Sequence, residues 1–208
     1  MSENRFASPE EQVILSKYVG WGGLDKAFSG YHWKAEYDEL RSLVKEGIIS
    51  EDDYNAARRS TMNAHYTDIS VIKAMYDGLS RLGFTGGRML EPSAGVGNFI
   101  GAMPDEMTSK VKSWTAVELD NITGNILKYL YPNSDVRIEG FEKANIPNGY
   151  MDVAIGNVPF GNYAVIDKSY PKQVTGAIHN YFFAKSLDKV RPGGIVMFIT
   201  SNYTMNSK

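Results

Sequence analysis

Three short segments of this chain combine residue types that could bind a ligand and act on it. The first is Arg88–Phe99, where an apolar pair precedes Glu91 and a turn containing Gly95 and Gly97. Such glycines allow a tight turn and close approach of the backbone to a ligand. An ordinary strand-to-helix turn is the alternative, because Ile100 replaces the third glycine of the dinucleotide-binding fingerprint. The pattern therefore indicates a ligand site only together with the other two segments.

The second segment, 113–120, is apolar and ends in two carboxylates, Glu118 and Asp120. A carboxylate at the tip of a strand suits a ribose diol, which offers two hydroxyl donors. The alternative is that Asp120 caps the next helix while Glu118 is solvated.

The third segment is Asn157-Val-Pro-Phe160, which follows the hydrophobic stretch 151–156. A chance turn at this place would more often hold Gly, Asp or Ser. Neighbouring parallel strands end on the same side of a sheet, so the three segments can converge on one crevice.

Strand and helix patterns alternate from about residue 88 to residue 200 and would position these segments. The alternation predicts a Rossmann-like α/β fold, with a mostly parallel sheet and helices on both faces. A helix over 69–82 should begin at Thr67 or Asp68 and end at Gly83. Further expected elements are strands at 88–91, 113–120, 136–138, 151–157 and 195–200, helices over 122–130 and 178–190, and a turn at 191–194.

Residues 1–62 form a second unit, for which helices over 12–19, 33–44 and 54–59 are expected, the last after a capping box at Ser50. The plain interpretation is a helical appendage packed on a core domain that spans 63–208. The alternative is a docking surface for a partner or nucleic acid, with Trp21, Trp33, Arg58 and Arg59.

Composition limits the function classes. The chain has 208 residues, of which 43% are hydrophobic, enough for one core. It has no Cys and three well-separated His, so we expect no metal. A net charge of −2 is not the footprint of a chain that holds nucleic acid by itself. Without a signal peptide or a long apolar run, a cytoplasmic protein is expected.

The two motifs, Glu91-Pro-Ser-Ala-Gly-Val-Gly-Asn-Phe99 and Asn157-Val-Pro-Phe160, resemble in order and spacing the S-adenosylmethionine-dependent amino-group DNA methyltransferases, in particular those acting on N6 of adenine. This resemblance covers about 64–206 and implies a class I methyltransferase fold. The segments Tyr18–Gly23 and Ile155–Asn162 further resemble the methylase portion of large methylase–helicase proteins of conjugative elements and phages.

The resemblance implies a role for each matching residue. Asn157 and the carbonyl of Val158 would accept the two N–H groups of a flipped adenine, Pro159 would shape the turn, and Phe160 would stack on the base. Glu118 would bind the cofactor ribose. The other implied cofactor-binding residues are Tyr66, Thr67, Glu91, Pro92, Ser93, Ala94, Gly95, Gly97, Asn98, Phe99, Leu119, Phe141, Glu142 and Asn157 itself.

Two features depart from the family pattern. Val158 stands where Pro is usual, a trait shared with the conjugative-element relatives, and the acid of the third cofactor motif is either displaced or absent around Gly140–Glu142. The family also has two further strands and a target-recognition region, so this chain is expected to be part of a longer protein that carries them. The expected partners are duplex DNA and further, helicase-like domains. RNA or a protein glutamine as acceptor, and a weakly active or inactive module of a conjugation or anti-restriction protein, remain alternatives.

Overall fold

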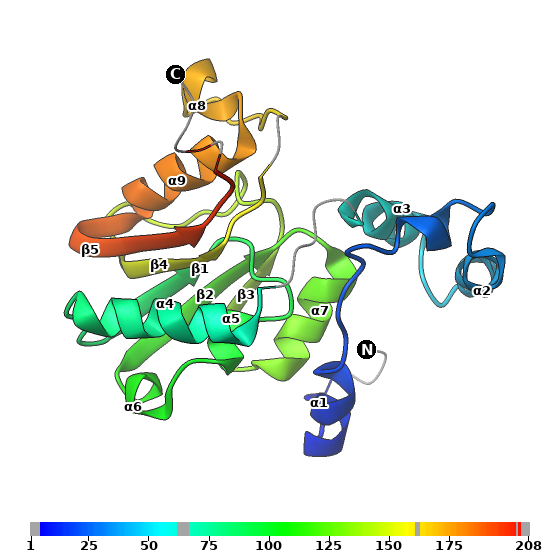
Figure 1. Cartoon of the computed structure of the whole chain (residues 1–208), viewed down its shortest axis with the longest axis horizontal. Helices are drawn as coiled ribbons and strands as arrows, with labels where there is room; N and C mark the ends of the chain where they lie inside the picture. Colours follow the sequence, from blue (N-terminus) through cyan, green and yellow to red (C-terminus); the bar gives the residue numbers. More distant parts are fainter. Residues whose placement is uncertain (1–4, 62–66, 161–162, 203, 205–208) are drawn as a thin grey trace.

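Five parallel strands form the centre of the fold, in the order β3-β2-β1-β4-β5 (Figure 1). The computed structural model describes residues 5–61, 67–160, 163–202 and 204, apart from the side chain of Arg59. The strands are β1 Gly87–Glu91, β2 Val111–Glu118, β3 Asp135–Ile138, β4 Met151–Asn157 and β5 Val190–Ile199. The predicted parallel sheet is therefore confirmed.

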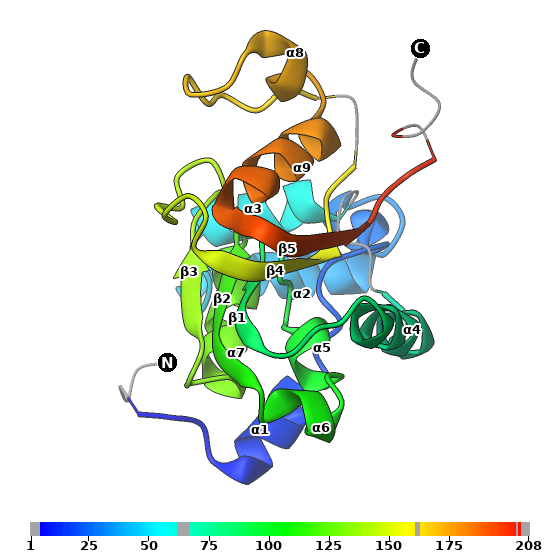
Figure 2. The same ribbon diagram turned by 90° about the vertical axis from the view of Figure 1, so that its left-hand side faces the viewer.

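Helices cover both faces of this sheet, as predicted (Figure 2). One face carries α4, α5 and α6, with α7 packed on β2 and β3; the other carries α9. The helices of this part of the chain are α4 Ile69–Arg81, α5 Asn98–Gly101, α6 Asp105–Thr108, α7 Asn121–Leu130, α8 Lys172–Thr175 and α9 Ile178–Lys189.

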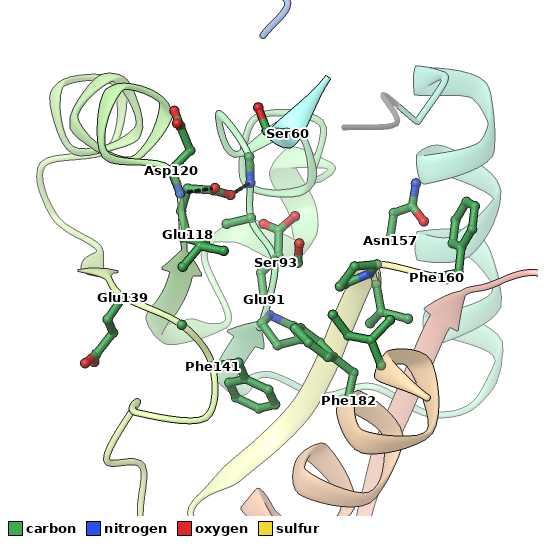
Figure 3. A pocket seen from close by; sticks show the side chains of 18 of the residues that line it. Ser60, Glu91, Ser93, Glu118, Asp120, Glu139, Phe141, Asn157, Phe160 and Phe182 are labelled. Atoms are coloured by element: carbon green, nitrogen blue, oxygen red, sulfur yellow. Dashed lines mark hydrogen bonds between the residues drawn. The ribbon is translucent and has the colours of Figure 1, made fainter. Parts of the chain in front are cut away.

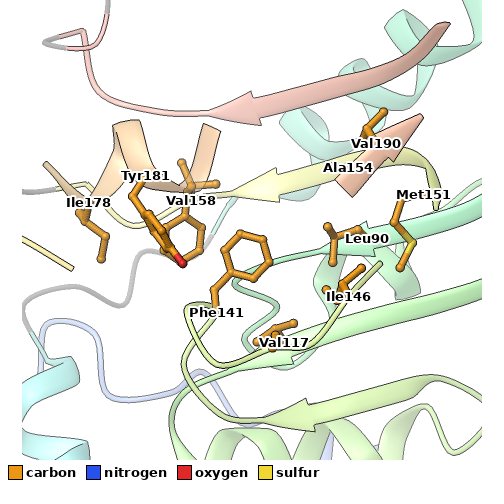
Figure 4. Close-up of a cluster of buried hydrophobic side chains, with 12 residues drawn as sticks. Leu90, Val117, Phe141, Ile146, Met151, Ala154, Val158, Ile178, Tyr181 and Val190 are labelled. Atoms are coloured by element: carbon orange, nitrogen blue, oxygen red, sulfur yellow. The ribbon is translucent and has the colours of Figure 1, made fainter. Parts of the chain in front are cut away.

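The two faces have separate cores because neighbouring strand residues point to opposite sides. Met89 packs with α4 on one face, and its neighbour Leu90 packs on the other. The Leu90 side includes Phe141 and Ile146, which come from the segment after β3 and belong to one core cluster with Leu90 and residues of α9 (Figure 4). This irregular segment therefore covers the part of the face that α9 leaves open.

The N-terminal helical unit, residues 5–61, packs against the sheet domain through α7. Its elements are α1 Pro9–Leu15, the 3-10 turn η1 Asp25–Phe28, α2 Lys34–Lys45 and α3 Glu51–Ser60. It has a small core of its own around Phe28 and Tyr54. A boundary near residue 62 stays a prediction, because 62–66 lie outside the described residues.

Helix starts follow the capping signals more closely than the apolar pattern. Ser50 and Asp68 cap α3 and α4, as predicted, and Gly83 follows α4 with a φ of +87°. The expected helix over 12–19 is wrong by three residues at its start and four at its end. Ser8 caps α1 in a capping box with Glu11, and Pro9 occupies the first turn, so the helix begins earlier and has ended by Ser16.

The turn expected at Arg191–Gly194 is wrong, because β5 already begins at Val190. Val190 pairs with Met151 and Ile195 pairs with Val153, so the intervening residues form an irregularity within the strand. The Arg191 guanidinium donates from Nε to Asp152 Oδ1 at 2.6 Å, which holds this part of β5 against β4. The sequence shows the turn-forming residues but not this long-range ion pair.

Gly97, at the N-cap of α5, is required by packing, and its replacement by alanine tests this. Its φ is +85°, and an added Cβ would lie 2.5 Å from the Tyr131 ring and 2.6 Å from Leu127. Gly97→Ala should lower the free energy of unfolding by about 2–4 kcal/mol, measured in urea. The matched Gly149→Ala has a φ of +65° but meets no atom within 4 Å, so it should cost only about 1–2 kcal/mol. Equal losses would contradict the packing role of Gly97.

Candidate active site

A cavity of about 470 Å³ lies at the carboxyl ends of β1, β2 and β4 (Figure 3). It brings together residues from all three segments that the sequence singles out. The lining includes Thr67, Glu91, Pro92, Ser93, Ala94, Gly95, Asn98, Phe99, Glu118, Leu119, Phe141, Glu142, Asn157, Val158, Pro159 and Phe160. Gly97 does not line the cavity but supports the turn from behind, and Tyr66 lies outside the described residues.

Glu91 places a carboxyl group at the floor of the cavity, at the tip of β1. The residue is 2% exposed, and the described residues supply no hydrogen-bond partner for its Oε2. Burial, with a smaller effect of the nearby Glu118 carboxylate, raises the pKa of Glu91 well above its ordinary value. A buried polar atom without a partner is costly, so this oxygen is available to a ligand.

The turn after β1 presents its backbone to the cavity. The Ala94 amide donates to the Val117 carbonyl at 2.9 Å, which fixes the turn against β2. Gly95 has a φ of +56°, and a Cβ added there would meet no atom within 4 Å. A ligand can therefore approach this backbone closely, as the sequence predicts.

Glu118 is held at the tip of β2 by two backbone amides. Its Oε2 accepts from Gly95 N and its Oε1 from Asp120 N, each at 2.8 Å (Figure 3). Burial raises the pKa of Glu118 to about 7, although both amide hydrogen bonds act to lower it. The alternative of a solvated Glu118 is therefore wrong, whereas the capping role of Asp120 is confirmed by its acceptance from Thr123 N.

The Asn157–Phe160 segment continues from β4 along the other side of the cavity. Val158 is 1% exposed, packs in the core beneath α9, and donates its amide to the Ile199 carbonyl at 3.3 Å. Figure 3 shows Asn157 and Phe160 across the cavity from Glu118. Valine at this position therefore anchors the segment by apolar packing, which a proline could not combine with an amide hydrogen bond.

Several lining residues were not predicted from the sequence. Glu139 follows β3 directly, and its amide donates to the Glu118 carbonyl at 2.9 Å. The sequence signal for Glu139 is the order Glu139-Gly140-Phe141, which places an acid shortly before a phenylalanine at the end of the third strand. The Glu142 carboxylate folds back over Gly140 and occupies the place where a Cβ would lie. Asp120 and Gly140 also line the cavity, in segments that the sequence singles out. The remaining unpredicted lining residues are Ala56, Ser60, Val96, Tyr163, Val165, Ile178 and Phe182.

A buried ion pair supports the wall formed by Val165 and α9. Lys185 Nζ lies 3.6 Å from Asp167 Oδ2 and donates to the Glu142 carbonyl at 3.0 Å. The Tyr181 hydroxyl donates to the same Asp167 oxygen at 2.6 Å. Burial opposes ionisation of Asp167, but the hydrogen bonds and the lysine lower its pKa overall. These contacts hold the segments around Glu142 and Asp167 against α9.

The described part of the chain offers no cluster of three His, Cys, Asp or Glu side chains that could hold a metal ion. No described helix is both long enough and apolar enough to cross a membrane.

The fold is that of the class I methyltransferases. A candidate class I S-adenosylmethionine-dependent methyltransferase from Listeria monocytogenes has a similar structure, with a TM-score of 0.56 over 97% of this chain and 76% of that chain, at 14% identity. A modification subunit of a candidate type I restriction enzyme from Vibrio vulnificus YJ016 gives a TM-score of 0.49 at 15% identity, over 89% of this chain and 37% of that one.

In sequence, the chain is similar to the Defense against restriction protein B of Escherichia phage P1. The two are 33% identical over 175 residues, which is 78% of this chain. The chain spans about 8% of the length of that relative. No family model matches the sequence.

Glu91→Gln tests whether Glu91 is held neutral by burial. The pKa of Glu91 is higher in the folded chain than in the unfolded chain. At pH values between these two pKa values the folded state binds more protons, so the contribution of Glu91 to the free energy of unfolding falls as pH rises. The variant should therefore gain melting temperature relative to the wild type at pH 8, and gain less at pH 5. A melting-temperature difference that does not change between the two pH values would contradict the raised pKa.

Proposed function

We propose that this chain is the cofactor-binding domain of a methyltransferase that transfers a methyl group from S-adenosylmethionine to N6 of adenine in DNA. The observation that carries the proposal is one cavity that joins the glycine turn and the carboxyl groups of the buried Glu91 and the half-buried Glu118 to the Asn157–Phe160 segment. Its volume, about 470 Å³, is within the range of small-molecule sites.

The lining residues fit this cofactor. Glu118 keeps lone pairs for the ribose hydroxyls beyond its two amide hydrogen bonds. Leu119, which is 75% exposed at the cavity, and the buried Phe141 offer apolar surface to the adenine ring. The unpartnered oxygen of Glu91 and the open backbone at Gly95 would face the methionine part. When bound, the cofactor supplies a methyl group activated on a positively charged sulfur.

The other end of the cavity suits a planar base with an exocyclic amino group. The nitrogen of such a group is a poor nucleophile because its lone pair is delocalised into the ring. Asn157 Oδ1 and the Val158 carbonyl would accept its two N–H groups, which localises the lone pair and stabilises the positive charge that develops. Phe160, Tyr163 and Phe182 would contact the faces of a base flipped out of the duplex.

The wider setting of this domain is also a proposal. Similarity to a phage anti-restriction protein of much greater length supports a place in a larger cytoplasmic protein. Target recognition, helicase-like domains and most phosphate contacts would then come from elsewhere in that protein, in keeping with the net charge of −2. The same similarity favours a second candidate function, in which the fold serves an anti-restriction protein with weak or no methyl transfer.

Asn157→Ala separates the two functions. If Asn157 accepts from the target amino group, the variant should lose methyl transfer by about 100-fold or more while its affinity for the cofactor changes little. Transfer of a radiolabelled methyl group to unmethylated DNA, RNA and protein is measured in parallel, followed by identification of the modified nucleoside. The exposed Asn180, changed to Ala, is the control. Unchanged transfer by Asn157→Ala would exclude the proposed role, and no transfer by the wild type would favour the second function.

Glu118 should make binding of the cofactor dependent on pH. Its pKa is about 7, and only the ionised carboxylate is purely an acceptor for ribose hydroxyls. The affinity for S-adenosylhomocysteine, measured by calorimetry, should therefore rise severalfold from pH 6 to pH 8. Glu118→Gln should bind more weakly and lose this dependence, whereas Glu106→Gln, an exposed position on α6, should keep it. The same pH dependence in Glu118→Gln would assign it to another group.

A further inference from the structure

We propose that the N-terminal helical unit is the outer wall of the cofactor site, and that its attachment to α7 sets how tightly the nucleoside end of the cofactor is held. This inference rests on the proposed function. It assigns a role to residues 5–61 that their sequence does not reveal.

Two residues of α3 line the same cavity as the strand-tip carboxyl groups. Ala56 and Ser60 contribute to the lining together with Glu118 and Asp120. Figure 3 shows Ser60 near Glu118 and the glycine turn, on the opposite side of the cavity from Phe141. The Ser60 hydroxyl donates to the Ala57 carbonyl at 2.8 Å, so its oxygen lone pairs can still accept from a ligand. The cavity therefore has one wall that does not belong to the sheet domain.

Side-chain hydrogen bonds fasten this wall to α7. Asn121 Nδ2 donates to Asp53 Oδ1 at 3.0 Å, between the first residue of α7 and the first turn of α3. Gln12 Nε2 donates to the Tyr129 carbonyl at 3.0 Å near the other end of α7. Hydrogen bonds from Asn121 and Ser50 lower the pKa of Asp53, so its carboxylate is charged at neutral pH.

A chain of hydrogen bonds links the same interface to the carboxylate that would bind ribose. The Tyr18 hydroxyl lies 3.4 Å from Thr123 Oγ1, which donates to Asp120 Oδ1 at 2.7 Å. The Asp120 amide in turn donates to Glu118. Displacement of the helical unit would therefore disturb the residues that fix Glu118.

The glycine- and aromatic-rich segment Tyr18–Gly23 explains how α3 is held in place. Gly20 and Gly23 have φ values of +67° and +75° and turn the chain back toward α3. Trp21 packs edge-on against Phe28, and Phe28 packs on Tyr54 of α3. The Gly23 amide donates to the Thr61 carbonyl at 3.1 Å, just past the end of α3. The segment thus positions the helix whose last residue lines the cavity.

A charge placed at Asn121 tests the proposal. Asn121→Asp sets two carboxylates against each other across the interface, yet an acid in the first turn of α7 should not harm the helix. Affinity for S-adenosylhomocysteine, measured by calorimetry at pH 7.5, should fall at least about fivefold, a typical coupling between sites. The double variant Asn121→Asp with Asp53→Asn restores an amide–carboxylate pair and should return to within about twofold of the wild type.

The control is Asn180→Asp, which adds the same charge at an exposed position of α9, away from Asp53 and outside the cavity lining. It should bind within about twofold of the wild type. Hydrogen exchange of the wild type provides a second measurement: S-adenosylhomocysteine should slow exchange of the amides of α3. If the wild type binds but Asn121→Asp binds equally well and α3 gains no protection, this inference is overturned and the proposed function stands. If the wild type does not bind, the proposed function and this inference both fail.

Discussion

The hydrogen bond from the Gly95 amide to Glu118 is the contact on which the site depends. It joins the turn after β1 to the tip of β2, so that a carboxylate and an open backbone face one cavity. Burial of this carboxylate is unfavourable by itself, and two amide donors reduce the cost. Glu91 lies beside it without a partner for one oxygen among the described residues. The fold thus places two carboxyl groups with raised pKa values next to each other, as functional sites commonly do.

Residue patterns predicted the sheet and its tips because they are local. Apolar strands, the glycine turn and the caps at Ser50 and Asp68 all act within a few residues. The bounds of α1 were missed although their signals, Ser8 and Pro9, are local. The other failures came from contacts distant in sequence. The Arg191–Asp152 pair draws an expected turn into β5. Ser60, the last residue of an ordinary amphipathic helix, carries no signal that it lines a cavity formed mostly by residues of the sheet domain.

The side of the cavity near Val165 and α9 depends on a different stabilising arrangement. Lys185 lies in the predicted helix over 178–190 and would be expected to be solvated, yet its ammonium group is buried between Asp167 and the Glu142 carbonyl. Breaking such a buried pair leaves an uncompensated charge, so both partners are needed together. This pair fixes the irregular segments before α9 without regular secondary structure. Periodicity does not predict contacts of this kind.

The order of the sheet places β5 at one edge, where in the described residues it pairs only with β4. The irregularity at Arg191–Gly194 interrupts the start of this edge, but Ile195–Ile199 continues in regular register. The outer side of this stretch presents unpaired backbone donors and acceptors beside apolar side chains. Such an edge is a template for adding a strand. In concentrated solution, two copies of this chain could therefore associate edge to edge, and a strand from elsewhere in a longer protein would prevent it.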